Sequence, residues 1–190
     1  VSYVIQPGPL VLPLLSAGAV IAILCWRRGR PAWRNLRSTC GVGLLAIGVA
    51  LWLGAGRPAV LISAQGDVVG VMTAAGRSLS KPKGGSFTVG EWLEKDGDIA
   101  TQPEAAARPG WQGPTKQRRF DLGDVELLHL TGKGSAEAAR QACSAGRIIV
   151  TDQPVEMRAN GCLLFDADRL RRSGAIAMVW DGQALRQTSA

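Results

Sequence analysis

The chain has 190 residues, of which 46% are hydrophobic, and a formal net charge of +7. The basic excess is local, because five of the 22 basic residues and none of the 15 acidic ones lie between residues 27 and 37. The remaining 17 basic and 15 acidic residues nearly balance, which excludes a polyanion-binding surface built from overall charge. Such a surface has to come from local clustering.

Two apolar stretches, residues 10–26 and 39–55, flank these arginines and contain no charged residue. A membrane span needs about 20 mostly apolar residues, with a range of about 17 to 25. The sequence therefore predicts a transmembrane helical hairpin over residues 1–56, with spans at about 10–26 and 39–55. The alternative is a pair of buried helices, which Pro13 and the glycines of the second stretch allow.

The arginines of the connecting loop are the predicted determinants of topology. Short arginine-rich loops stay in the cytoplasm, so both outer ends of the hairpin are expected on the other side. Residues 57–190 then form one soluble extracytoplasmic domain. Because the chain begins with Val1 instead of Met, we expect a longer protein upstream. The five topology-determining residues are Arg27, Arg28, Arg30, Arg34 and Arg37.

Residues 57–190 have the pattern of an α/β or α+β domain built in layers. Strands at 59–63 and 67–72 flank Gln65-Gly66, and a third short strand is expected after Gly76. A helix follows, with Ser86 as its cap. Residues 99–114 are rich in Ala, Pro, Gly and Gln, which predicts a loop or weakly ordered linker.

The second half of this part alternates strands and helices. In residues 124–130 the alternation places Val125, Leu127 and His129 on one face and Leu128 and Leu130 on the other. The other expected elements are a helix from Ser135 to Cys143, strands at 147–151 and 163–165, a helix capped by Asp166, and a hairpin over 175–188.

Cys143 and Cys162 are 19 residues apart in the sequence. In an oxidising compartment they are expected to form a disulfide, with two buried free thiols as the alternative. Cys25 and Cys40 lie in the apolar stretches and are interpreted as small hydrophobic residues. No metal site is expected, because no second Cys or His lies within four residues of Cys143 or Cys162.

Few residues point to catalysis, and no catalytic residue, metal or cofactor is expected. The single histidine, His129, lies in an apolar strand pattern and cannot supply a metal site alone. The acidic pairs Asp96/Asp98 and Asp121/Asp124 flank glycine, as turns do, although a magnesium site stays open.

Residues 131–135 (Thr-Gly-Lys-Gly-Ser) resemble part of a phosphate-binding loop but lack its spacing. They are interpreted as an ordinary turn, with weak anion binding at a helix N-terminus as the alternative.

One basic cluster has an aromatic neighbour. Lys116, Arg118 and Arg119 precede Phe120, and Trp111 lies five residues upstream of the cluster. Single-stranded nucleic acid is commonly held by cations that follow the phosphates and aromatic rings that stack on bases. The cluster is therefore the candidate DNA-binding site, with a solvated loop as the alternative.

In their order and residue composition these segments resemble the C-terminal part of ComEC-type competence proteins, the inner-membrane channels of DNA uptake. The resemblance covers nearly the whole chain, through motifs that are individually loose. They are the Trp/Arg-rich connector 25–33, segments 57–63 and 66–72, 91–98 and 142–150, and Cys162 with 166–175.

The resemblance implies a multi-pass inner-membrane protein whose periplasmic domain is similar to a metallo-β-lactamase. The chain lacks the family's histidine-rich metal motif, so a non-enzymatic domain with a structural or DNA-guiding role is expected. The implied partners are single-stranded DNA, the lipid bilayer and other membrane proteins of the competence machinery, with a homo-oligomer also possible. The alternative functions are a membrane-anchored interaction domain unrelated to DNA and a degenerate phosphodiesterase.

Overall fold

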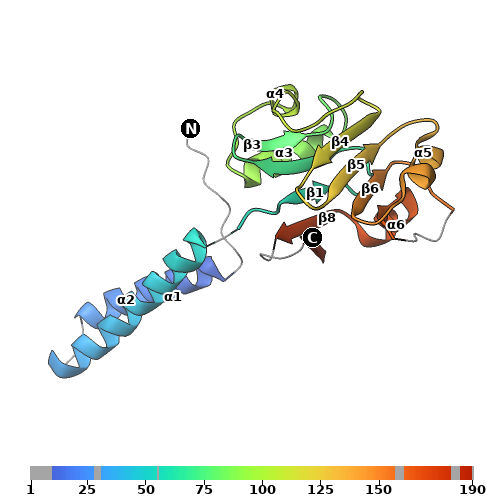
Figure 1. Cartoon of the computed structure of the whole chain (residues 1–190). Coiled ribbons are helices and arrows are strands. Elements are labelled where there is room, and N and C mark those ends of the chain that lie inside the picture. The colour runs from blue at the N-terminus through green and yellow to red at the C-terminus, as the bar shows by residue number, and fades with distance from the viewer. Residues whose placement is uncertain (1–9, 28–30, 55, 157–160, 181–184, 190) are drawn as a thin grey trace. The chain divides into compact units, whose positions relative to one another are not determined.

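The computed structural model describes residues 10–27, 31–54, 56–156, 161–180 and 185–189. The chain divides into two compact units after Gly56. The first unit contains helices α1 (Val11–Arg27) and α2 (Pro31–Leu53). The second unit contains the remaining helices and all the strands (Figure 1).

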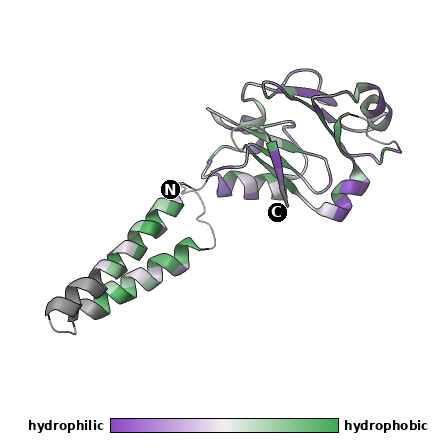
Figure 2. Cartoon of the chain, turned by 60° about the horizontal axis from the view of Figure 1, so that its bottom comes forward, coloured by the Kyte–Doolittle hydropathy of each residue, from purple (hydrophilic) through white to green (hydrophobic). Residues whose placement is uncertain are grey.

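Helices α1 and α2 pack against each other through glycines. A Cβ added to Gly18 would lie 2.9 Å from the carbonyl oxygen of Gly41, and one added to Gly41 would lie 2.7 Å from the nitrogen of Ala22. The two backbones therefore approach too closely for any larger side chain. Apolar side chains of these helices, such as Leu12 and Ile23, are exposed. Figure 2 shows that hydrophobic residues recur along both helices.

The prediction of a transmembrane hairpin is wrong. Among the described residues, no helix combines the length and the apolar character that a membrane span requires. Helix α1 has 17 residues, or about 26 Å of helix, against a hydrocarbon core of about 30 Å. Helix α2 has 23 residues, but only the part from Thr39 onward is uncharged, or about 23 Å of helix.

The predicted topology-determining arginines fall outside what the structure describes. Arg28 and Arg30 lie outside the described residues, and so do the side chains of Arg27, Arg34 and Arg37. The prediction that these residues orient a membrane hairpin loses its basis together with the spans.

The second unit is an α+β domain with two sheets. The five-stranded sheet has the order β3-β2-β1-β8-β9, and every pair in it is antiparallel. Its strands are β1 (Val60–Ile62), β2 (Val69–Thr73), β3 (Gly76–Leu79), β8 (Ile176–Trp180) and β9 (Leu185–Ser189).

The four-stranded sheet has the order β4-β5-β6-β7, in which β5, β6 and β7 are parallel and β4 is an antiparallel edge strand. Its strands are β4 (Gln117–Asp121), β5 (Glu126–Leu130), β6 (Arg147–Thr151) and β7 (Leu163–Phe165). The helices of the unit are α3 (Ser86–Lys95), α4 (Gln102–Ala106), α5 (Ser135–Ala142) and α6 (Ala167–Ser173).

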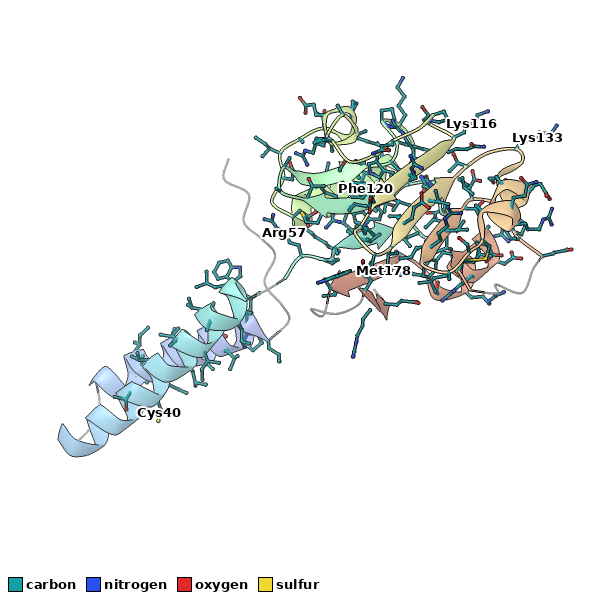
Figure 3. All side chains as sticks on the ribbon, in the orientation of Figure 1. Cys40, Arg57, Lys116, Phe120, Lys133 and Met178 are labelled. Carbon is teal, nitrogen blue, oxygen red and sulfur yellow. A yellow bond between two sulfur atoms is a disulfide. The ribbon has the colours of Figure 1, made fainter. Side chains whose placement is uncertain are left out.

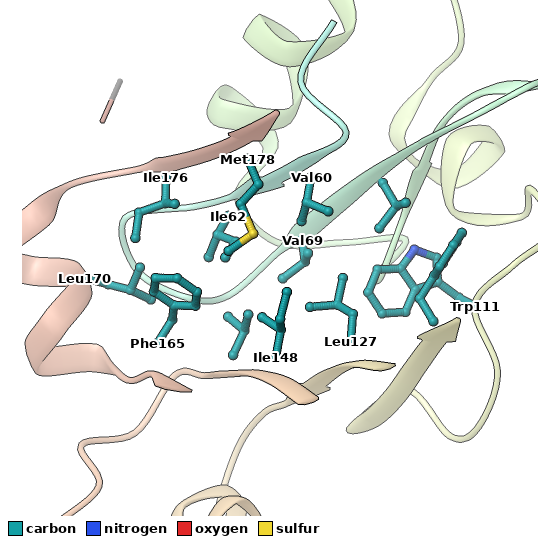
Figure 4. Packing of buried hydrophobic residues seen from close by; sticks show 13 residues of the cluster. Val60, Ile62, Val69, Trp111, Leu127, Ile148, Phe165, Leu170, Ile176 and Met178 are labelled. Carbon is teal, nitrogen blue, oxygen red and sulfur yellow. The ribbon is translucent and has the colours of Figure 1, made fainter. Parts of the chain in front are cut away.

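Strand alternation explains why the two sheets face each other. In β1, Val60 and Ile62 lie in the apolar cluster between the sheets, whereas Leu61 packs on the other face with α3 and α4. In β5, Leu127 lies between the sheets and Leu130 faces α5. The result is four layers, helices outside and two sheets inside, around the core shown in Figure 4.

The segment predicted as a linker contains helix α4. Thr101 is the residue before this helix, and its backbone nitrogen and hydroxyl each donate a 2.7 Å hydrogen bond to Glu104. This Thr-x-x-Glu pattern is a capping box, a start signal for a helix that the sequence contains. The prediction of a loop over 99–114 is therefore wrong at its centre.

A disulfide joins Cys143 to Cys162, whose Cα atoms are 5.3 Å apart. The predicted pairing is confirmed. The bond ties the residue that follows α5 to the residue that precedes β7, and it closes a loop across β6.

Replacing both Cys143 and Cys162 with alanine is expected to lower the free energy of unfolding by about 3 kcal/mol, because a loop of this length loses substantial chain entropy when closed. Urea unfolding of the full chain measures the change. Cys40→Ala is the control, since Cys40 is an exposed free thiol. A double variant as stable as this control would contradict the prediction.

Candidate nucleic-acid interface

The structure does not bring Lys116, Arg118 and Arg119 together as one cluster. They lie on or beside β4, where successive side chains point to opposite faces of the sheet. Arg119 lies on the outer face, donates a 3.2 Å hydrogen bond to Gln112, and forms a 3.6 Å ion pair with Glu126.

Arg118 and the two expected stacking aromatics point inward. Trp111 and Phe120 are buried, with exposed fractions of 8% and 7%, and their rings pack edge to face at 5.3 Å between centroids. Arg118 is half-buried and donates a 3.4 Å hydrogen bond to the carbonyl of Trp111. These rings belong to the core and are not available to stack on a base.

A different set of cations gathers at one end of the domain. We call it the basic end, and define it by Lys81, Lys83, Lys116 and Lys133, which are four of the five lysines in the chain. The backbone nitrogen of Thr131 donates a 2.9 Å hydrogen bond to the carbonyl of Lys116, which places Lys116 beside the loop that carries Lys133. Figure 3 shows both lysines at this end.

The segment with Lys81 and Lys83 reaches the same end through the turn between β1 and β2. A Cβ on Gly85 would lie 3.0 Å from a carboxylate oxygen of Asp67 in that turn. The carbonyl of the neighbouring Gly66 is 3.0 Å from Nε2 of His129, near the end of β5. Three segments distant in sequence thus bring their lysines to one end.

These lysines differ from most of the other described cations in their lack of an acidic partner. In the part of the chain that the structure describes, no ion pair involves any lysine of the basic end. The remaining lysine, Lys95, pairs with Glu91. Six arginines are also paired with acids: Arg77, Arg108, Arg119, Arg140, Arg147 and Arg171.

The loop that resembles a phosphate-binding loop already holds a carboxylate. The backbone nitrogen of Gly132 donates to both oxygens of Asp152, at 2.9 and 2.8 Å, and the hydroxyl of Ser135 donates to the same carboxylate at 3.1 Å. The structure therefore favours the turn interpretation, because an acidic side chain occupies the position that a phosphate would need.

His129 is a buried residue of β5 that contacts the β1–β2 turn near the basic end. It is fully buried, and its Nε2 donates to the Gly66 carbonyl, because a carbonyl can only accept. The pKa of His129 is lowered to about 4, mainly by burial and to a smaller extent by the nearby charge of Lys81, against the raising effect of the Gly66 hydrogen bond. Among the described residues, Nδ1 of His129 and Nε of Arg118 are buried without a hydrogen-bond partner.

Three of the four aspartates in the sequence pairs Asp96/Asp98 and Asp121/Asp124 form hydrogen bonds or ion pairs within the fold. Asp96 forms a buried ion pair with Arg77, and Asp98 pairs with Arg108, which lowers the pKa of the Asp98 carboxyl. Asp121 accepts a 2.9 Å hydrogen bond from the nitrogen of Gly123, as in a turn. Over the described ranges, no group of three or more His, Cys, Asp or Glu side chains could hold a metal ion.

Sequence reasoning missed most of this end. Lys81 and Lys83 belong to a Lys-Pro-Lys-Gly-Gly run, and Phe87 follows it with an exposed fraction of 86%. Lys133 was interpreted only as part of a turn. The run was a signal in the sequence, but the meeting of its lysines with Lys116 and Lys133 is a property of the fold.

Comparison with models of protein families, with curated proteins and with solved structures gives no match to this chain. The resemblance to ComEC-type proteins therefore stays a prediction.

Proposed function

We propose that the domain Arg57–Ala190 binds single-stranded nucleic acid at the basic end and does so without catalysing a reaction. The observation that carries the proposal is the meeting of four lysines without acidic partners at one end of the domain. Cations of this kind neutralise phosphates, and this sequence-independent attraction supplies most of the affinity of non-specific binding.

Two acids at this end, Asp67 and Asp152, are held by other groups. Asp67 accepts a 2.6 Å hydrogen bond from the hydroxyl of Ser63, and Asp152 accepts from Gly132 and Ser135. Their charge is therefore spread over local donors. Four lysines against two such carboxylates leave an excess of positive charge at this end.

A single strand suits the site better than a duplex. Phe87 is an exposed aromatic ring only four residues after Lys83, and the combination of cations and exposed aromatic rings is typical of single-strand binding. The resemblance stated above implies DNA as the strand, with a guiding role for the domain.

Replacing Lys81, Lys83, Lys116 and Lys133 together with alanine is expected to weaken binding of a fluorescent oligo(dT) strand and to flatten its salt dependence. Each lost phosphate contact lowers the slope of log K against log salt by about 0.7 for a single strand, so the four together lower it by about 2 to 3. Fluorescence anisotropy of the full chain over a salt series measures both quantities.

The control variant also loses four positive charges, but from positions outside the basic end: Lys95, Arg140, Arg171 and Arg172 are replaced with alanine. All four residues are exposed. This variant is expected to keep most of the affinity and the slope. Equal losses in the two variants would show attraction by net charge alone. Absence of binding by the unaltered chain would favour an interaction domain unrelated to nucleic acid.

A further inference from the structure

A groove of about 470 Å³ lies on the outer face of the four-stranded sheet, between β4 and α5. Its volume falls within the range of about 300 to 1,000 Å³ that is usual for ligand pockets. Leu128 and Leu130 of β5 form its floor. Gln117 and Arg119 line it on the β4 side, and Ala138 and Gln141 line it on the α5 side.

The groove exists because α5 covers the sheet only in part. Its small residues Ala138 and Ala142 pack near Leu128. In the antiparallel pair β4–β5, Gln117 lies opposite Leu130 and Arg119 lies opposite Leu128. Each leucine of the apolar floor therefore has one polar side chain of β4 beside it.

One end of the groove opens at the basic end. Gln117 directly follows Lys116, and Leu130 directly precedes Thr131, whose nitrogen bonds to the Lys116 carbonyl. Among the described residues that line the groove, Arg119 is the one that carries a charge, and none is acidic. A strand with its phosphates on the lysines therefore meets no carboxylate among these lining residues.

The other end of the groove has the opposite character. A neighbouring groove of about 570 Å³ shares Gln112 and Arg119 with the first one, and its charged lining consists of Asp121, Asp124, Glu126, Arg119 and Arg147. Glu126 is the ion-pair partner of both Arg119 and Arg147. In this acidic groove three carboxylates outnumber two arginines, so phosphates approach more favourably from the lysines.

Side-chain amides supply hydrogen-bonding groups along the groove. Within the described residues, the amide of Gln117 makes no hydrogen bond, so its donor and acceptor groups are both free. Gln141 donates to Glu137 at 3.0 Å, which leaves its amide oxygen as an acceptor. A nucleobase has an apolar face and an edge of donors and acceptors, and a single strand exposes both.

We infer that this groove binds a base of the same strand whose phosphates contact the basic end. The face of the base lies on Leu128 and Leu130, and its edge bonds to the amides of Gln117 and Gln141. The inference rests on the proposed function, because the lysines bring the strand to the groove. The groove thereby distinguishes a strand with accessible bases from any other polyanion.

The test compares three ligands of the full chain: oligo(dT), an abasic strand of the same length, and inorganic polyphosphate. The unaltered chain is expected to bind oligo(dT) several-fold more tightly than the abasic strand. Replacing Gln117 and Gln141 with alanine is expected to weaken oligo(dT) binding by at least about fivefold, as the loss of two hydrogen bonds implies. Binding of the abasic strand and polyphosphate should stay unchanged.

A second variant, Ala138→Trp, fills the groove and is expected to remove the preference for bases. Its control is Ala145→Trp, which places the same side chain in the acidic groove and should keep the preference. Both tryptophan variants are compared with the unaltered chain by urea unfolding. The two exposed glutamines provide the same test without a change in packing.

The outcomes separate the inference from the proposed function. Equal affinity of the unaltered chain for oligo(dT) and the abasic strand would overturn the inference, and lysine-dependent binding of both would leave the proposed function intact. A base preference that survives in both groove variants would also overturn the inference. Absence of binding of all three ligands would overturn the inference and the proposed function together.

Discussion

Replacing Arg77 with alanine is expected to lower the free energy of unfolding by about 3 to 5 kcal/mol. Arg77 has an exposed fraction of 0%, yet its guanidinium makes a two-point ion pair with the carboxylate of Asp96. It also donates to the carbonyls of Gly70 and Pro58, at 3.4 and 3.2 Å. Its removal leaves a buried carboxylate without a counter-charge and takes one donor away from each of two carbonyls.

Urea unfolding of the full chain measures this loss. The matched control is Arg171→Ala, which breaks an ion pair between side chains that are 71% and 48% exposed and should cost at most about 1 kcal/mol. The double variant Arg77→Met with Asp96→Leu removes both charges and is expected to be more stable than Arg77→Ala. Equal losses for Arg77→Ala and Arg171→Ala would refute the structural role of the buried pair.

Acidification is expected to cost the domain up to about 3 kcal/mol between neutral pH and pH 4, through His129 alone. Burial lowers the pKa of His129 to about 4 in the folded chain, whereas the unfolded chain has the ordinary value of about 6.5. As pH falls through 6.5, His129 therefore becomes protonated in the unfolded chain but stays neutral in the folded chain. The stability is fully present above pH 6.5 and is lost as pH falls toward 4.

Urea unfolding at several pH values between 7 and 4.5 measures this dependence, and the chain offers a clean control. His129 is its single histidine, so no other imidazole titrates. The variant His129→Gln keeps an N–H donor toward the Gly66 carbonyl but cannot bind the proton. It should be less stable at pH 7 and show a flatter profile down to pH 5. Parallel profiles for the two chains would contradict the buried, neutral state of His129.

The patterns that predicted the fold were those that depend on neighbours in the sequence. Alternation placed Leu127 and His129 on one face of β5, and β6 and β7 occupy the predicted residues. Asp166 caps α6 as expected, with a 2.9 Å hydrogen bond from the nitrogen of Arg169. These features follow from side-chain periodicity and local hydrogen bonding, which a sequence contains directly.

Two predictions were wrong because the sequence pattern behind each is compatible with more than one structure. Residues 10–26 and 39–55 are apolar, but apolar length alone does not separate a membrane span from other helices, and the helices that formed fall short of one. The basic segment at 116–119 was treated as one charged cluster. It forms a strand, and the pleat directs Arg118 inward and Arg119 outward.

By itself the sequence determined the strands of the parallel sheet, the cap of α6, and a cysteine pair suited to a disulfide. Only the tertiary structure decided which surface carries charge. Lys81 and Lys133 are far apart along the chain, and sheet pairing and the packing of the β1–β2 turn bring their segments to one end. Local propensity acts over a few residues, whereas the position of a charge relative to distant charges depends on how the layers pack.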